Sequence, residues 1–251
     1  MLHRFVHAAI ALFWIATMAA VAVHERRGIP ASAGAARLGP PRIEPRPMEQ
    51  FRILFGGREI GTVTNEILPD AGGGVSVASR TEGQLPLLGL ANRLDLRVRA
   101  RLDRASRLVS LRIDLDSAAM SFSLSGEVEG GEFVLRAAAG GGAAAGEPVA
   151  RLRIPEGVVV QPGAGLLAAV PADARPGDRW TFPILNPLTL ALDEGLATVI
   201  GEAADGSGRR LREIEIVVAS LTSRAFVDDS GAVVREESPL GLSLERVEAP
   251  R

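Results

Sequence analysis

Residue types that supply nucleophiles, bases and metal ligands are nearly missing from this chain. Cysteine, tyrosine and lysine do not occur at all, and the three histidines are His3, His7 and His24. Nucleophilic catalysis needs an activated Ser, Cys or Lys beside a base, so Ser-His-Asp, Cys-His and Ser-Lys arrangements are excluded after His24. Zinc sites built from His and Cys are excluded there for the same reason.

Excess charge and nucleotide-binding motifs are absent too. The formal net charge is -2, and the arginines alternate with Asp and Glu instead of clustering, so we expect no nucleic-acid partner. No Gly-x-Gly-x-x-Gly or P-loop motif occurs, because the glycine runs at 72–74 and 140–142 lack a following helix and a lysine. We therefore expect no cofactor.

Carboxylates are the remaining class of catalytic group, and they form three adjacent or alternate pairs: Asp114 with Asp116, Asp228 with Asp229, and Glu236 with Glu237. Paired carboxylates hydrolyse glycosides, but sugar sites usually offer aromatic stacking faces, and aromatic residues make up only 4% of this chain. Asp228, Asp229 and Ser230 lack EF-hand spacing, which favours a turn over a calcium site. We expect a non-enzymatic protein without a metal, and keep a carboxylate hydrolase as an alternative.

Residues 1–27 contain a run of apolar or small residues, from Phe5 to Val23, interrupted only by His7 and Thr17. As a helix this run would be about 28 Å long, which is close to the thickness of a bilayer core. The sequence therefore predicts a signal anchor that stays as one transmembrane helix in the inner membrane. A signal peptide cleaved after residue 22 is the alternative. Either signal places the bulk of the chain in the periplasm, or exports it if the peptide is cleaved.

Residues 28–47 are rich in Pro, Gly, Ala and Arg, a composition that favours extended chain and does not bury apolar area. We interpret this segment as a tether that holds a domain of residues 48–251 off the membrane.

Apolar and polar residues alternate with a period of two throughout residues 48–251. Between residues 93 and 101, Leu94, Leu96, Val98 and Ala100 alternate with charged residues, and residues 109–115 repeat the pattern. We expect these two strands to pair, with Arg and Asp crossing on the wet face. In two earlier strands, Asn65 shares a face with its apolar neighbours 63 and 67, and Ser79 shares one with 75 and 77.

About a dozen short strands at regular spacing, with no long amphipathic helix, predict an all-β, all-antiparallel domain. A sheet of this size must curl, close or split into two layers. We expect one strongly curved sheet or an incomplete β-barrel, and a two-sheet sandwich is the second choice. Residues 103–107, 205–208 and 228–231 carry turn chemistry.

Three apolar segments, at residues 85–90, 158–170 and 184–192, break the alternation. One interpretation is that they form loops or short helices that plug an open barrel end. The other is that they form mobile flaps over a cavity for a lipid-like apolar ligand. The second interpretation makes these residues candidates for ligand binding: Leu85, Leu87, Leu88, Leu166, Leu167, Ile184, Leu188 and Leu190.

Four short motifs together resemble a known pattern. They are the strand, Gly turn and Ile-Gly of residues 51–61, the Pro-Gly-Asp turn of 176–178, the aromatic-x-Asp-x-x-Gly strand of 226–231 and the Pro-x-Gly of 239–241. Their order is similar to DUF3108-type periplasmic β-domains and to the non-catalytic, β-rich N-terminal region of bacterial exported transglutaminase-like proteins. The resemblance covers residues 48–247. It implies a periplasmic accessory or binding domain without a transferable active site.

The sequence thus favours a membrane-tethered, non-enzymatic domain that binds a protein partner in the cell envelope. A carrier or sensor of a lipid-like ligand within the curved sheet is the alternative.

Overall fold

The computed structural model describes residues 45–87, 90–118, 121–139, 147–155, 158–160, 170–171, 173–186, 191–218, 221–238 and 241–247. The predicted anchor, residues 1–27, and most of the predicted tether lie outside these residues. Within the described residues, no helix has the length and hydropathy needed to cross a membrane.

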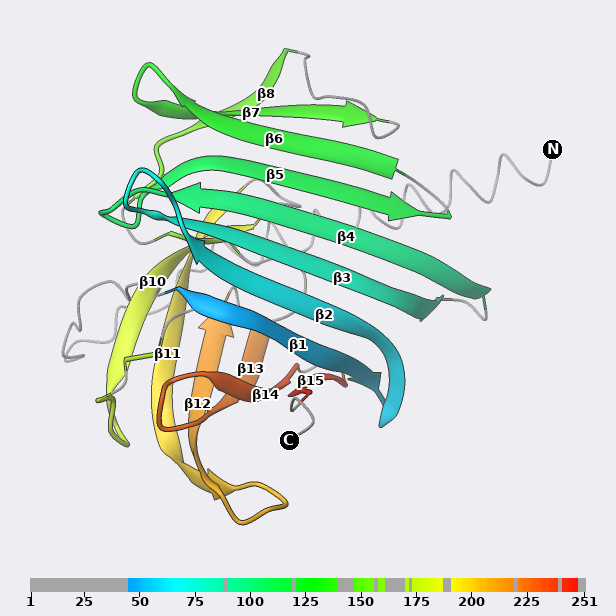
Figure 1. The fold of residues 1–251 in the computed structure, drawn as a ribbon, viewed down its shortest axis with the longest axis vertical. Coiled ribbons are helices and arrows are strands. Elements are labelled where there is room, and N and C mark those ends of the chain that lie inside the picture. The colour runs from blue at the N-terminus through cyan, green and yellow to red at the C-terminus, as the bar shows by residue number, and fades with distance from the viewer. Residues whose placement is uncertain are drawn as a thin grey trace. The chain divides into compact units, whose positions relative to one another are not determined.

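The first half of the domain is a meander of eight antiparallel strands, which Figure 1 shows running side by side from blue to green. They are β1 (Arg46–Phe55), β2 (Arg58–Pro69), β3 (Val75–Leu87), β4 (Leu90–Leu102), β5 (Leu108–Ser117), β6 (Ser121–Glu129), β7 (Glu132–Ala139) and β8 (Pro148–Leu152). At 13 residues each, β3 and β4 are longer than the short strands that the sequence predicts.

The second half supplies the strands β9 (Val159–Val160), β10 (Arg179–Asn186), β11 (Ala191–Ala204), β12 (Arg210–Val218), β13 (Leu221–Val227), β14 (Val233–Glu237) and β15 (Leu242–Arg246). All fifteen strands belong to one sheet, in the order β8 to β1 followed by β15 to β9. The joint between the halves is the antiparallel pair of β1 and β15. The short strand β9 is the exception to the predicted antiparallel order, because it pairs with β10 in parallel.

The expected single sheet is therefore confirmed over a two-layer sandwich, and the sheet is not closed, because β8 and β9 form its two edges. In Figure 1, β2 to β6 run across the view whereas β11 to β13 run down it, so the sheet turns between its two halves.

The predicted pairing of residues 93–101 with 109–115 is confirmed as the pair β4 and β5, with Val98 opposite Ile113 and Arg97 opposite Asp114. Val98 and Ile113 are 3% and 2% exposed, whereas Arg97 is exposed. We call the side of the sheet that carries Val98 the inner face and the opposite side the outer face. The two-residue period alone decides which side chains lie on each face.

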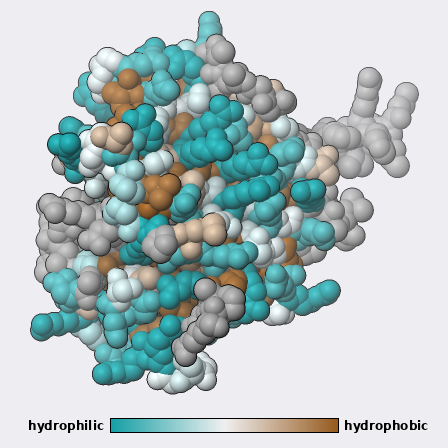
Figure 2. All heavy atoms as spheres, in the orientation of Figure 1, coloured by the Kyte–Doolittle hydropathy of each residue, from teal (hydrophilic) through white to brown (hydrophobic). Residues whose placement is uncertain are grey.

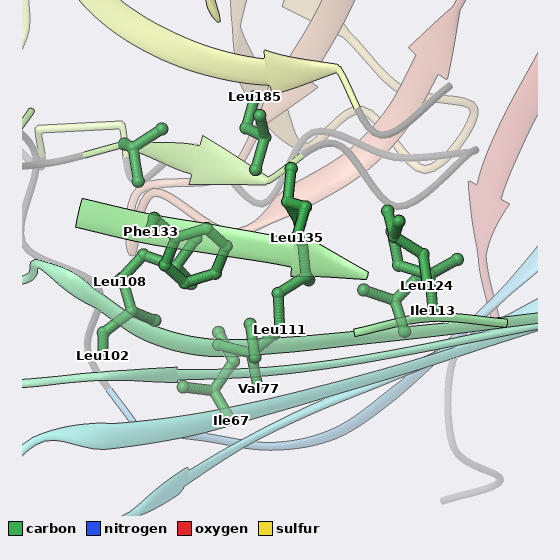
Figure 3. Close-up of a cluster of buried hydrophobic side chains, with 13 residues drawn as sticks. Ile67, Val77, Leu102, Leu108, Leu111, Ile113, Leu124, Phe133, Leu135 and Leu185 are labelled. Atoms are coloured by element: carbon green, nitrogen blue, oxygen red, sulfur yellow. The ribbon is translucent and has the colours of Figure 1, made fainter. Parts of the chain in front are cut away.

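Buried apolar side chains form three clusters, and their strand residues lie on the inner face except Leu185, which follows Ile184 in the regular ladder of β10 and so points to the other side of that strand. The first joins β2 to β7 with β10 and comprises Ile67, Val77, Val98, Ala100, Leu102, Leu108, Leu111, Ile113, Leu124, Phe133, Leu135, Val158 and Leu185. Figure 3 shows Leu185 of β10 on the opposite side of this cluster from Ile67 and Val77. Since β7 and β10 lie near opposite ends of the strand order, the sheet must curl for them to share a core.

The second cluster fills the inner face of the β10 to β13 half, with Trp180, Phe182, Ile184, Val199, Ile214 and Val227 among its members. Phe182 lies against Gly195, its cross-strand partner, where any side chain would overlap the ring. The third cluster lies at the joint between the halves and comprises Phe51, Ile53, Val63 and Leu244.

The three apolar segments that we interpreted as loops or flaps, at residues 85–90, 158–170 and 184–192, each contain strand residues. Residues 85–87 extend β3, where Leu85 pairs with Asn92 and Leu87 with Leu90. Residues 184–186 and 191–192 form the paired ends of β10 and β11. Sequence hydropathy missed these strands because their apolar runs do not alternate.

Hairpin turns beginning with Asp share one geometry. In the β4–β5 turn the Asp103 N–H donates to the carbonyl of Arg107, and in the β11–β12 turn the Asp205 N–H donates to that of Arg209. In each turn a carboxylate oxygen of the Asp accepts the N–H groups two and four residues later. The fourth residue has a positive φ, and it is a glycine at 208 but a serine at 106. The turns predicted at 103–107 and 205–208 are confirmed.

The assignment of faces predicts opposite outcomes for two neighbouring residues of β4. Val98→Asp should destabilise the domain by more than about 3 kcal/mol, because it buries an unpaired carboxylate. Arg99→Ser, on the outer face, should change stability by less than about 0.5 kcal/mol. Urea unfolding of both variants checks this, and similar losses from both would contradict the register.

The turn geometry makes a second prediction at matched positions. Ser106→Gly should stabilise the domain by about 0.5 kcal/mol, because Ser106 adopts a φ of 58° that costs an L-residue energy but not glycine. Gly208→Ala should destabilise it by about 1 kcal/mol through backbone strain alone, since a Cβ there meets no atom within 4 Å. Thermal unfolding of both variants measures the two signs, and a loss of stability in Ser106→Gly would refute this account of the turns.

Candidate functional site

Three buried polar side chains interrupt the apolar inner face in the middle of the sheet. Asn65 of β2 is the cross-strand partner of Ser79 of β3, and Thr81 follows two residues after Ser79 on the same face. Ser79 and Thr81 are therefore about 7 Å apart along the strand. We call Asn65, Ser79 and Thr81 the polar patch. Their exposed fractions are 6%, 4% and 5%.

Hydrogen-bond partners are missing for one oxygen atom of each of these side chains. They are Asn65 Oδ1, Ser79 Oγ and Thr81 Oγ1. A buried polar group without a partner costs about 1–3 kcal/mol, and native proteins contain few of them. Three such groups on two adjacent strands are therefore a feature that needs an explanation, and bound water or a ligand would supply one.

Apolar side chains border the polar patch. Across the strands, Thr81 pairs with Val63 and Leu96, and Ser79 pairs with Val98. The patch thus separates the third cluster, which contains Val63, from the first cluster, which contains Val98. A molecule bound there would meet polar atoms at its centre and apolar side chains around it.

One ionisable residue is a direct register neighbour of the polar patch. Glu49 of β1 is the cross-strand partner of Asn65. Its carboxylate lies 3.4 Å from the guanidinium of Arg246, which also contacts Asp228 at 3.0 Å. Another arginine of β1, Arg46, donates to the carbonyl oxygen of Gly231 at 3.4 Å.

Two further polar groups are buried on the inner face away from the patch. Trp180 is 1% exposed in the second cluster, and its Nε1–H has no hydrogen-bond partner. Glu236 of β14 is 8% exposed and lies opposite Leu244 of β15.

Few of the predicted ligand-binding residues have a described environment. Ile184 is fully buried and packs within the second cluster, so it is a core residue of β10. Leu85 and Leu87 belong to β3, but their side chains are not described. Leu88, Leu166, Leu167, Leu188 and Leu190 lie outside the described residues. Sequence alternation placed Asn65 and Ser79 on apolar faces, but it did not identify the polar patch, because the pairing of these residues and the lack of hydrogen-bond partners depend on the register between β2 and β3.

Six carboxylates have a pKa below the ordinary value: Asp95, Asp103, Asp114, Glu129, Asp205 and Asp228. Hydrogen bonds from Arg112 lower the pKa of Asp114, and the Ser207 hydroxyl, with backbone N–H groups, lowers the pKa of Asp205 to about 2. A general acid that works near neutral pH needs the opposite shift. No group of three or more His, Cys, Asp or Glu in the same ranges could hold a metal ion.

Asp228 anchors a turn, as the sequence indicated. One carboxylate oxygen accepts hydrogen bonds from Ser230 Oγ and from the backbone N–H groups of Ser230 and Ala232, and the other accepts one from Arg246. Burial opposes ionisation, but these hydrogen bonds hold the pKa of Asp228 below its ordinary value.

Ion pairs cover the outer face of β3 to β5, both across strands and within them. Arg80 and Arg97 are cross-strand partners, and both form two-pronged contacts with Asp95, at 2.9 and 2.7 Å for the shorter bonds. Arg112 bonds to Asp114 within its own strand. Arg and Asp do face each other between β4 and β5 as expected, since Arg97 lies opposite Asp114 and the charge of Arg99 helps to lower the pKa of Asp114, but the hydrogen bonds of Asp95 with Arg97 and of Asp114 with Arg112 lie within one strand. A strand side chain reaches its neighbour two residues away as readily as its partner across the ladder.

Among the open hollows of the surface, two are lined by residues that the structure describes. One, of about 400 Å³, lies among Asp95, Arg97, Arg99, Arg112 and Asp114, and much of its charge is already paired. The other, of about 960 Å³, lies beside the β1–β2 turn, and none of its lining residues is buried. Figure 2 shows a largely hydrophilic face with small separate hydrophobic areas. Neither hollow contains a buried unpaired group like those of the polar patch.

No protein-family model matches the sequence, and no curated protein matches it. A β-barrel-like protein of the domain of unknown function DUF1849 from Brucella abortus has a similar crystal structure, with a TM-score of 0.54 and 10% identity over 83% of this chain and 98% of that chain. A DUF1089 family protein from Pseudomonas aeruginosa gives a TM-score of 0.41 and 15% identity, over 84% of this chain and 96% of that one.

The first of these similarities places the fold among β-barrel-like all-β domains. At this identity it concerns the fold alone, and the second similarity is too distant to support an argument. Neither structure is a DUF3108 or transglutaminase-like protein, so that resemblance stays a prediction.

The outer-face ion pairs predict a pH-dependent effect of Asp95→Asn. The hydrogen bonds from Arg80 and Arg97 hold the pKa of Asp95 below its ordinary value, although burial opposes them. Asp95 therefore stabilises the fold above pH about 4, and this contribution is lost as the pH falls through its lowered pKa. Asp95→Asn should cost about 1–2 kcal/mol at pH 7, because it leaves Arg80 opposite Arg97 without the shared carboxylate.

Urea unfolding from pH 7 to pH 2.5 measures this effect, and the difference from the parent protein should shrink in acid. Asp116→Asn is the matched control, because Asp116 is exposed on the same face and lies directly opposite Asp95. A deficit in Asp95→Asn that stayed constant down to pH 2.5 would contradict the assignment.

Proposed function

We infer that this chain is a non-enzymatic binding domain that is held at the inner membrane by residues 1–27 and faces the periplasm, and that its curved sheet takes up a lipid-like ligand. The observation that carries the ligand function is the polar patch: three buried oxygen atoms without hydrogen-bond partners. The anchor and tether are supported by the sequence alone. A protein partner in the envelope, which the sequence favoured, is the alternative.

The ligand function differs from the one that the sequence suggested. Predicted apolar flaps would have covered a wide cavity, but Trp180, Phe182 and Phe133 are buried and fill the inner face on either side of the patch. Binding would therefore be local, with hydrogen bonds to the patch and contacts with the apolar side chains that surround it. Such a mixture of an apolar lining and a few polar groups is typical of small-molecule sites.

The non-enzymatic part of the proposal rests on the residues that are present. After His24 the chain has no His, Cys, Lys or Tyr, and the lowered pKa values of Asp95, Asp114, Asp205 and Asp228 favour the ionised form of those carboxylates. Asp114, which the sequence left as a candidate acid, is bonded to Arg112 and to Ser123 Oγ at 2.6 Å. These contacts are those of a structural ion pair.

Thr81→Val tests the ligand function with two readouts. Full-length protein extracted from its own membranes in polymer-bounded discs should release a specific small molecule, detected by mass spectrometry, and Thr81→Val should lose most of it. In ligand-free protein the same variant should be more stable by about 1 kcal/mol, because it removes an unpaired buried hydroxyl of nearly the same volume.

The matched control is Thr64→Val, which makes the same change on the opposite face of β2, where Thr64 pairs with Arg80. It should keep the bound molecule. If the parent protein carries no specific molecule and Thr81→Val is more stable under all conditions, the patch holds water only and the ligand function is wrong. The envelope-partner function would then be the one to pursue.

A further inference from the structure

Charge around the polar patch bears on which ligands it could accept. The patch itself offers an amide oxygen and two hydroxyls, none of which is ionised. Its cross-strand neighbours are apolar except for Glu49, whose carboxylate has the same sign as an anionic ligand. An anionic group buried without a facing cation is strongly disfavoured.

The arginines of the neighbouring strands are not free to meet an anion at the patch. Arg80 lies between Ser79 and Thr81 in sequence, but it points to the outer face and bonds to Asp95. Arg97 does the same from β4. On the inner side, Arg246 is shared by Glu49 and Asp228, and Arg46 donates to the Gly231 carbonyl.

The donors and acceptors of the patch also limit which head groups it can bind. Asn65 Oδ1 can only accept a hydrogen bond, whereas each hydroxyl of Ser79 and Thr81 can donate one and accept others. A head that carries both a donor and an acceptor, such as a hydroxyl next to an ester, would satisfy all three atoms. An ammonium group could donate to all three oxygens but would bury a charge, and a carboxylate or phosphate, which only accepts, would leave Asn65 Oδ1 unpaired.

We propose that the polar patch recognises an amphiphile with an uncharged head that bears hydroxyl, ester or amide groups, and that it discriminates against fatty acids and phosphate-headed lipids. This inference rests on the proposed ligand function. The apolar body of the ligand lies against the side chains that border the patch, among them Val63 and Val98.

The experiment compares probes that share one acyl chain and differ in the head. Full-length protein in phosphatidylcholine nanodiscs is incubated with 1-monooleoylglycerol, oleic acid, oleoyl lysophosphatidic acid or oleylamine at equal concentration, and adducts are counted by native mass spectrometry. The monooleoylglycerol adduct should exceed each charged probe by about tenfold or more, since one well-placed hydrogen bond or one unpaired charge is worth that factor.

Variants locate the binding to the patch. Ser79→Ala and Thr81→Val should each reduce the monooleoylglycerol adduct by about tenfold, whereas the outer-face control Thr64→Val should leave it unchanged. Far-ultraviolet circular dichroism and the urea midpoint, measured on each variant without probe, show that it is folded. Both patch variants remove only an unpaired hydroxyl, so neither should lose stability.

Two kinds of failure are separable. Binding of oleic acid, the lysophosphatidic acid or oleylamine that equals or exceeds that of monooleoylglycerol and is sensitive to Thr81→Val would overturn the head-group selectivity but leave the ligand function standing. Equal reduction by Thr64→Val and Thr81→Val would remove the assignment to the patch. Absence of every adduct, together with no molecule released from native membranes, would overturn both proposals.

Discussion

One constraint governs the structure: each strand must bury its inner side, although all fifteen belong to one open sheet. A flat sheet with one apolar face would leave that face in water. Curling brings β10 against β7 and lets the sheet cover itself, so that Leu185 completes a cluster built mainly from the other half. Apolar residues recur at every second position, so the hydrophobic effect determines which face of each strand is buried. It also favours the curvature that buries this face.

On the outer face, positively charged side chains of neighbouring strands lie next to each other. Arg80 and Arg97 lie directly opposite each other, an arrangement that costs energy in an antiparallel pair. Asp95 resolves it by accepting both guanidinium groups, and it is itself only 9% exposed. An ion pair between exposed groups adds little to stability on its own. Here the ion pairs offset the repulsion between arginines on adjacent strands, so that the strands can pair.

The polar patch breaks the rule that the rest of the inner face obeys. Proteins leave local rules violated mainly at sites where the violation serves a function. Its place in the sheet is also distinctive, because β2 lies beside β1, which forms the joint with β15, and the patch lies between residues of the first and third clusters. Neutral hydrogen-bonding atoms, apolar borders and arginines that are already engaged are the observations on which the proposal of an uncharged amphiphile rests.

Local sequence determined the alternating strands, their faces and their turns, but not the strand segments at 85–87, 184–186 and 191–192. Alternation around Val98 and the Asp-led turns at 103 and 205 follow from interactions within a few residues, so they were predicted correctly. The same alternation put Asn65 on the face of Val63, and Ser79 on that of Val77. Only tertiary structure decided that these two meet and are buried without partners, because that depends on the register between β2 and β3 and on the curl that covers them. It also decided the pairing of β1 with β15, since strands about 190 residues apart are joined by the burial of a common core, which no local pattern encodes.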